Sequence, residues 1–195
     1  NPTQTMKQVL FTLIMMLCTT LAWAQNAEKL YNEGKSLYDA KKYEAAIEKL
    51  RPAAEKGHKK AQYRLGRCYD KGNGVEEDHQ MAFYWYSKGA EQNHAKSLYQ
   101  LGKCHYKGKG TPVNYTKAVQ YYTKAANQGN ANGRFGLGKC YMKGKGVKAD
   151  LEKAKSLFQK AVKDEKDGPE ILQELKEEAS FGDDDAKAIL KMIGE

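Results

Sequence analysis

The sequence lacks the residue patterns of several large enzyme classes. No Ser-x-x-Lys, Gly-x-Ser-x-Gly or His-Glu-x-x-His motif occurs in its 195 residues, which argues against serine acyl transfer of those classes and against a zinc-binding helix. The four histidines are scattered, and His58 and His94 have no cysteine beside them. Residues 133–140 resemble a phosphate-binding loop without its final Ser or Thr. We therefore expect no catalytic residue, no cofactor and no metal site, so the protein is predicted not to be an enzyme.

Long apolar runs are also scarce, and the sequence has only one. Met6-Lys7 precedes the apolar run from Val9 to Leu21, and Ala22-Trp23-Ala24 then gives the small-x-small pattern at which signal peptidase cuts. The run is short for a bilayer span. We predict that residues 1–24 are a cleaved signal peptide and that the protein is exported, either periplasmic or secreted. The alternatives are an N-terminal membrane anchor and, less favoured, a lipid anchor on Cys18; no later segment is long and apolar enough to span a membrane.

Acidic residues are few in the front of the chain. Residues 25–146 carry 23 basic and 11 acidic side chains, whereas residues 147–195 carry 9 and 13. A basic front and an acidic back favour binding of an acidic partner over the front part. Nucleic acid is not expected as the partner, because export removes it from reach and no recognition motif occurs.

What the sequence has instead is an internal repeat of 36 residues. Three consecutive units can be superimposed on one another with apolar residues, glycines, cysteines and aromatic residues in register. The aligned positions are Leu65, Leu101 and Leu137; Gly66, Gly102 and Gly138; Cys68, Cys104 and Cys140; Gly72, Gly108 and Gly144; Gly74, Gly110 and Gly146; Ala82, Ala118 and Ala154; and Tyr86, Tyr122 and Phe158.

Each unit has the pattern of a helix hairpin. Apolar or small residues recur at spacings of three and four in its first half, which is one face of a helix, and the glycine pair then ends that helix. Asp78, Asn114 and Asp150 are predicted N-caps of the second helices. A hairpin of this size buries its remaining apolar face only by stacking on the next one, so the pattern predicts an array.

These motifs resemble the Sel1-like repeat (SLR) family. The resemblance rests on Leu65 to Val75 followed by Asp78, Ala82 and Trp85-Tyr86, and it recurs over Leu101 to Lys124 and Leu137 to Lys160. It implies an all-α fold, a right-handed α/α superhelix (solenoid) of stacked helix hairpins. The predicted segments are a tetratricopeptide-like hairpin at 25–57, repeats at 58–93, 94–129 and 130–166, and C-terminal capping helices at 167–195.

The cysteines of the repeats are expected to be buried, unpaired thiols. Equivalent positions of stacked helices lie about 10 Å apart, whereas disulfide-bonded Cα atoms lie within about 7 Å. This separates the chain from the cysteine-rich members of the family in Helicobacter, which pair cysteines within each repeat. The resemblance to those members leaves a β-lactam-binding or cell-wall-active enzyme as the alternative function.

The predicted function is that of an adaptor or scaffold for protein–protein interaction. In the related tetratricopeptide fold the first helix of each hairpin presents its ligand-contacting side chains to a concave groove, and here the corresponding positions combine cations with aromatic rings. We expect this groove to bind another protein or an acidic peptide, or a cell-envelope polymer, although the aromatic residues could instead only pack between helices. The predicted groove residues are Tyr31, Lys35, Tyr38, Lys60, Tyr63, Arg67, Lys71, Lys96, Tyr99, Lys103, Tyr106, Lys107, Phe135, Lys139, Met142 and Lys143.

Overall fold

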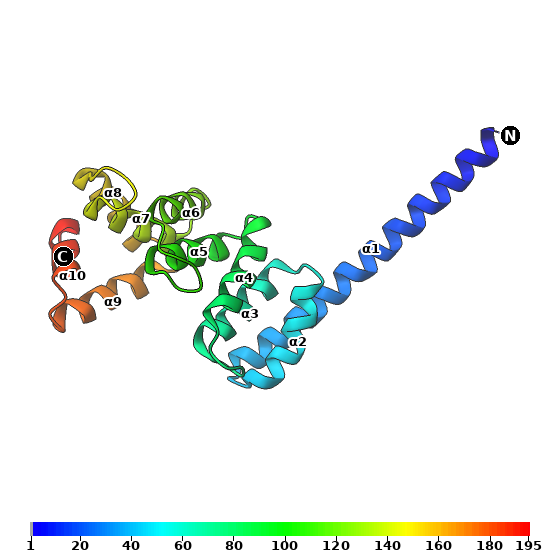
Figure 1. Ribbon diagram of the computed structural model, residues 1–195, viewed down its shortest axis with the longest axis horizontal. Coiled ribbons are helices and arrows are strands. Elements are labelled where there is room, and N and C mark those ends of the chain that lie inside the picture. The colour runs from blue at the N-terminus through cyan, green and yellow to red at the C-terminus, as the bar shows by residue number, and fades with distance from the viewer. Residues whose placement is uncertain (1) are drawn as a thin grey trace. The chain divides into compact units, whose positions relative to one another are not determined.

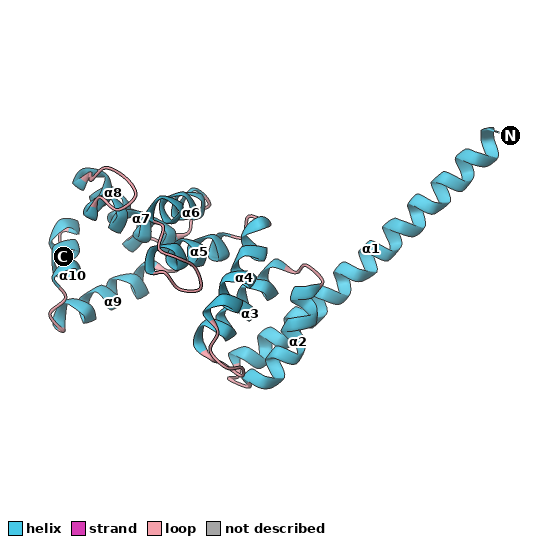
Figure 2. Cartoon of the chain, viewed as in Figure 1, coloured by secondary structure: helices cyan, strands magenta, loops and turns pink. Residues whose placement is uncertain are grey.

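The computed structural model describes residues 2–195, apart from the side chains of residues 2–5, 7, 17 and 18. Cys18, the position considered for a lipid anchor, therefore has a side chain outside the described part. Between residues 2 and 195 the chain forms ten helices and no strand, joined by short loops (Figures 1 and 2). The predicted all-α class is confirmed. The chain divides into two compact units, residues 1–78 and 79–195.

The first unit consists of three helices. They are α1 (Pro2–Asp39), α2 (Tyr43–Glu55) and α3 (Lys59–Lys71), with α2 packed against both of the others. Every described side chain of α1 before Ala27 is exposed, whereas Ala27 and Tyr31 are buried. Among the described side chains of α1, those from residue 27 onward contribute to the core of this unit. Its segment from Gln8 is the one described helix that is long and apolar enough to cross a membrane, a test that a signal sequence also passes.

The second unit contains seven helices. They are α4 (His79–Glu91), α5 (Ala95–Lys107), α6 (Tyr115–Asn127), α7 (Ala131–Lys143), α8 (Leu151–Val162), α9 (Gly168–Ser180) and α10 (Asp184–Ile193). Helices α5 and α6 form one hairpin and α7 and α8 the next, and α7 packs against both α5 and α6. The hairpins therefore stack as the repeat pattern predicted.

The helix ends follow from residues that recur in each unit. The side chains of Asn114 and Asp150 accept hydrogen bonds from the N–H groups of Lys117 and Lys153, which confirms these two N-caps and satisfies backbone donors that a helix leaves unpaired. At the other end Gly144, like its equivalents Gly72 and Gly108, adopts a left-handed conformation directly after its helix. Glycine occupies such C-caps without steric cost.

Close contact between hairpins depends on the second glycine of each loop. A Cβ on Gly146 would lie 2.4 Å from the backbone carbonyl of Tyr115 at the start of α6. A Cβ on Gly110 would lie 2.0 Å from the carbonyl oxygen of His79. These loops touch the backbone of the preceding hairpin where no side chain fits, and this contact sets the distance between repeats.

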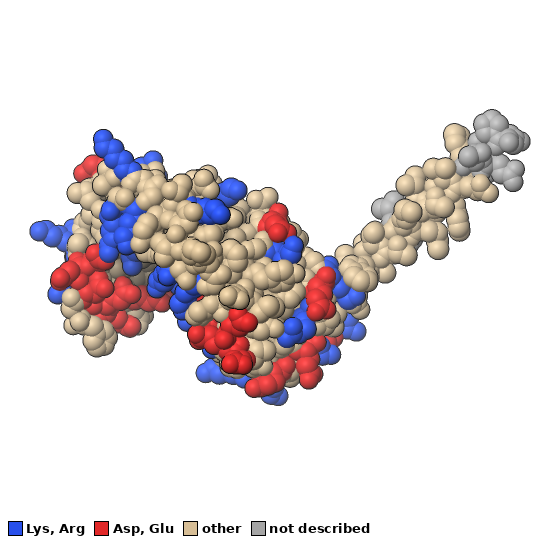
Figure 3. Space-filling model, viewed as in Figure 1, with Lys and Arg blue, Asp and Glu red and all other residues tan. Residues whose placement is uncertain are grey.

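The C-terminal helices close the core of the second unit. Ile171 and Leu175 of α9 and Ile189 of α10 are buried in one cluster with Phe158 of α8. The outer surface of this end is acidic, and Figure 3 shows acidic side chains gathered over α9 and α10 with basic side chains on the helices beside them. Helices α9 and α10 thus cover apolar surface of the last hairpin and carry negative charge outward.

Candidate binding cavity of the second unit

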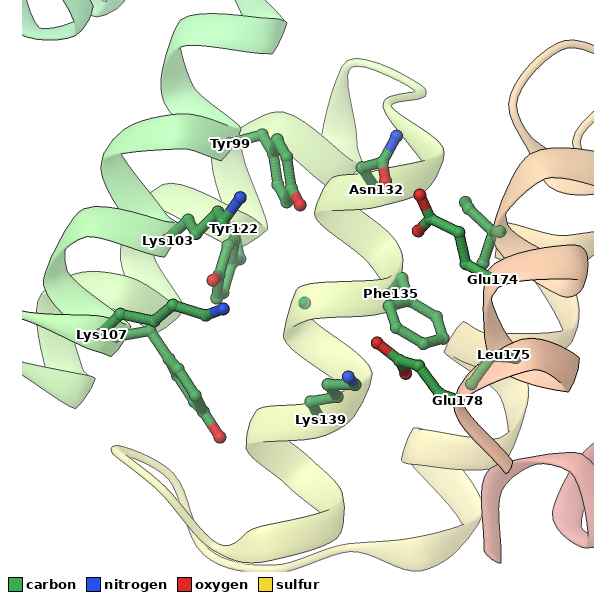
Figure 4. Close-up of a pocket in the computed structure, with 13 residues that line it drawn as sticks. Tyr99, Lys103, Lys107, Tyr122, Asn132, Phe135, Lys139, Glu174, Leu175 and Glu178 are labelled. Atoms are coloured by element: carbon green, nitrogen blue, oxygen red, sulfur yellow. The ribbon is translucent and has the colours of Figure 1, made fainter. Parts of the chain in front are cut away.

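A cavity of about 220 Å³ lies among helices α5, α6, α7 and α9. Figure 4 shows its two sides: the lysines of α5 on one side, and the carboxylates of α9 on the other, with α7 between them. The residues that line it are Tyr99, Lys103, Tyr106 and Lys107 of α5, Tyr122 of α6, Asn132, Phe135, Gly136 and Lys139 of α7, and Ile171, Glu174, Leu175 and Glu178 of α9.

Six of the predicted groove residues meet in this cavity: Tyr99, Lys103, Tyr106, Lys107, Phe135 and Lys139. They come from the first helices of two successive hairpins, which lie side by side because α5 packs on α7. The ammonium group of Lys139 lies 5.0 Å from the centre of the Phe135 ring, a cation–π distance. The structure thus brings three cations and three aromatic rings together around one cavity.

The other predicted residues of the second unit do not line the cavity. Lys96 is exposed on α5. Met142 packs against the core that α8, α9 and α10 share. Lys143 forms an ion pair with Asp185 of α10. At the end of α7 the capping helices therefore occupy the positions that the sequence assigned to a ligand.

In the first unit the predicted aromatic residues lie mainly in packing contacts. Tyr31 is buried and stacks on the ring of His58, with 4.4 Å between ring centres. The guanidinium of Arg64 lies 5.1 Å from the centre of the Tyr38 ring, and Lys35 forms an ion pair of 2.8 Å with Asp39. The remaining predicted residues here are the half-buried Tyr63 and Arg67, and the exposed Lys60 and Lys71.

Sequence reasoning missed the whole opposite side of the cavity. Glu174 and Glu178 stand one turn apart on α9 and face the cavity, as Figure 4 shows. Their spacing of four was visible in the sequence, but the acidic segment was assigned only a capping role. Because these carboxylates line the same space as the lysines, the site has a cationic side and an anionic side.

Tyr122 of α6 is a buried residue that lines the cavity. A Cβ on Gly102 would lie 2.5 Å from the Tyr122 ring, and a Cβ on Gly136 would lie 2.8 Å from it. Glycine at both positions therefore makes room for the ring. The residue is 4% exposed. Burial raises the pKa of its hydroxyl, and the nearby Tyr99 raises it further.

The repeat cysteines are buried and form no disulfide, as predicted. Cys68, Cys104 and Cys140 are not disulfide-bonded and are at most 5% exposed. Burial raises the pKa of Cys68 and of Cys140 from 9.0 to about 11. At neutral pH these thiols are protonated, which makes them poor nucleophiles and poor metal ligands.

The chemistry of the cavity suits binding. Its lining contains no serine, cysteine or histidine, and the described residues include no group of three or more His, Cys, Asp or Glu placed to hold a metal ion. Ammonium and carboxylate groups around an apolar floor can instead orient a charged ligand through directed hydrogen bonds.

The three repeats match a known protein family. The Sel1 repeat family matches residues 59–94, 95–130 and 131–164, more than half of the chain. The chain belongs to the Sel1 repeat family. Sel1 repeat proteins are generally scaffolds for protein–protein interaction and are typically non-catalytic. The family therefore agrees with an adaptor role at the general level.

Solved structures support the same assignment. The chain is similar to a Sel1 repeat protein from Oxalobacter formigenes, at 37% identity and a TM-score of 0.62, over 70% of this chain and 53% of that one. It is also similar to a protective antigen of uropathogenic Escherichia coli with an SLR fold, at 26% identity and a TM-score of 0.64, over 85% of this chain and 41% of that one. Helicobacter pylori cysteine rich protein B aligns at 26% identity with a TM-score of 0.48, over 72% of this chain and 94% of its own.

The chain thus spans about half the length of the first two of these bacterial relatives. The stacked hairpins of the second unit have the architecture of SLR solenoids, which confirms the predicted fold class. A search of curated proteins finds no match.

Proposed function

We propose that this Sel1 repeat protein is an exported adaptor that holds a segment of a partner protein in the cavity of its second unit. The observation that carries the proposal is the meeting of Lys103, Lys107 and Lys139 with Tyr99 and Phe135 around one cavity. Clustered cations attract carboxylates from a distance, and aromatic rings add apolar contact at short range. An acidic peptide segment or a carboxylate-bearing envelope component fits this side of the cavity.

The proposed adaptor role is tested by partner capture with charge reversal. The immobilised full-length protein is exposed to the solubilised envelope fraction of its native organism, and bound material is eluted along a salt gradient and identified by mass spectrometry. The expected result is a discrete partner that elutes with salt, because screening weakens interactions between exposed charges. The K103E/K107E/K139E variant is expected to lose this partner.

A matched control separates the cavity from net charge. Lys109, Lys148 and Lys155 are exposed and lie outside the cavity, so K109E/K148E/K155E changes the total charge by the same amount. Equal loss of the partner in both triple variants would show that charge alone matters. Unchanged capture by the cavity variant would show that the partner binds elsewhere.

Export is the second part of the proposal. The described side chains of α1 before residue 27 are exposed, and burial in the first unit begins at Ala27, three residues after the small-x-small pattern ends. Among the described side chains, loss of residues 1–24 would therefore remove none that is buried. N-terminal sequencing of the protein recovered from periplasm or culture medium is expected to begin at residue 25; an intact N-terminus in the membrane fraction would favour the membrane anchor.

We also propose that the chain consists of five segments after the signal peptide. They are a tetratricopeptide-like hairpin at residues 25–57, three repeats at 58–93, 94–129 and 130–166, and the capping helices at 167–195. The adaptor is proposed to be non-catalytic, and turnover of a chromogenic cephalosporin by the pure protein would contradict that part and favour the β-lactam-active alternative.

A further inference from the structure

We infer that the cavity of the second unit selects a ligand carrying a positive and a negative group side by side, namely a peptide segment in which an acidic residue adjoins a basic one. This inference deepens the proposed function and rests on it. A cavity lined only by lysines and aromatic rings would favour purely acidic ligands. The carboxylates of α9 change the expected ligand chemistry.

The two sides of the cavity carry opposite charge. Lys103 and Lys107 approach from α5 and Lys139 from α7, whereas Glu174 and Glu178 approach from α9 (Figure 4). A purely acidic segment would bring its second carboxylate close to those of α9, and like charges at short range repel. A basic side chain at that place would instead pair with Glu174 or Glu178.

The carboxylates of α9 are available for such a ligand. Among the described ion pairs none joins Glu174 or Glu178 to a basic residue, whereas other acidic residues of the capping helices are paired, as Asp185 is with Lys143. Both carboxylates also stand on a helix whose apolar face, with Ile171 and Leu175, is fixed in the core. Their positions are therefore held by packing that does not involve their charge.

Tyr122 adds a buried ring to the same cavity. The residue is 4% exposed and lines the cavity together with Tyr99 and Phe135. A bound segment would therefore gain apolar contact with aromatic rings in addition to its contacts with the charged groups.

The size of the cavity limits what it holds. A volume of about 220 Å³ is below the range of about 300–1,000 Å³ found for drug-sized ligands. It suits one or two residues of a segment whose remainder continues along the surface. The inference therefore concerns a pair of adjacent side chains and not a whole domain.

The test compares three capped dipeptides, acetyl-Glu-Lys-amide, acetyl-Glu-Glu-amide and acetyl-Lys-Lys-amide, whose only charges are on side chains. Each is titrated into the 15N-labelled full chain in an uncharged detergent, and binding is followed at the amide of Gly136, which lines the cavity. We expect the Glu-Lys dipeptide to bind about tenfold more tightly than the Glu-Glu dipeptide, the factor of one charge-assisted hydrogen bond.

Variants then assign the preference to α9. In E174Q/E178Q the preference for Glu-Lys is expected to disappear, because the shape of both side chains is kept and their charge is lost. The control E170Q/E177Q removes two charges from exposed positions of α9 outside the cavity and is expected to retain the tenfold preference. Both variants keep the apolar residues that fix α9, so folding is not at stake.

The outcomes separate this inference from the proposed function. If the Glu-Glu dipeptide binds the natural chain as tightly as Glu-Lys, the inference is wrong while a basic site for acidic segments stands. If no dipeptide moves the Gly136 signal but partner capture still depends on the three lysines, the inference again fails alone. Capture that is independent of those lysines overturns the proposed function as well.

Discussion

Replacement of Gly146 by alanine tests whether the second glycine of each loop sets the contact between hairpins. Gly146 has a φ of +74°, and a Cβ there would lie 2.4 Å from both the carbonyl carbon and the oxygen of Tyr115. Gly144 in the same loop has a similar φ of +65°, but its Cβ would meet no atom closer than 3.4 Å. The two substitutions therefore share the conformational cost and differ in the contact.

The expected magnitudes follow from these distances. A left-handed conformation costs an alanine about 1–2 kcal/mol, and G144A should lose about that much free energy of unfolding. G146A adds an overlap with backbone atoms, which cannot rotate away as a side chain can, and forced overlap costs typically about 1–3 kcal/mol. G146A should therefore be less stable than the natural chain by about 2–5 kcal/mol.

The assay is urea unfolding of the full chain followed by helical circular dichroism. Comparable denaturant slopes for the two variants would show that the same surface unfolds in each. The difference between G146A and G144A then measures the loop contact alone. If both variants lose the same stability, the loop does not touch the preceding hairpin at Tyr115, and the account of repeat spacing given above is wrong.

Three further outcomes are expected. Cys68 and Cys140 should resist alkylation at neutral pH in the folded chain and react in urea. Burial also raises the pKa of each thiol to about 11. The free energy of unfolding should therefore fall as pH rises from about 9 towards 11, because in this range the thiols of the unfolded chain lose their protons before those of the folded chain. N114A should lose about 1 kcal/mol in urea unfolding with removal of its cap, and an unchanged midpoint would contradict that bond. Y122A should lower the melting temperature, because Tyr122 is 4% exposed and its ring fills the space beside Gly102 and Gly136; an unchanged melting temperature would contradict this packing.

The sequence was a good guide to the hairpins because their determinants are local. The apolar spacing, the glycine that ends each first helix and the cap residues Asn114 and Asp150 act within one repeat, and repetition displays each of them three times. Burial of the cysteines followed from the same register. Cations and rings of α5 and α7 that the sequence placed in one groove also line one cavity, because hairpin stacking places equivalent positions side by side. Their role in binding stays a prediction.

The electrostatic character of the cavity was decided only by tertiary structure. Glu174 and Glu178 lie outside the repeats, so no periodicity related them to Lys103 or Lys139, and only the docking of Ile171 and Leu175 into the core aims their side of α9 at the cavity. The same docking pairs Lys143 with Asp185 and thereby removes a predicted groove cation. Local patterns thus determined which helices form and how the repeats stack, whereas the long-range packing of α9 determined which charges face the ligand.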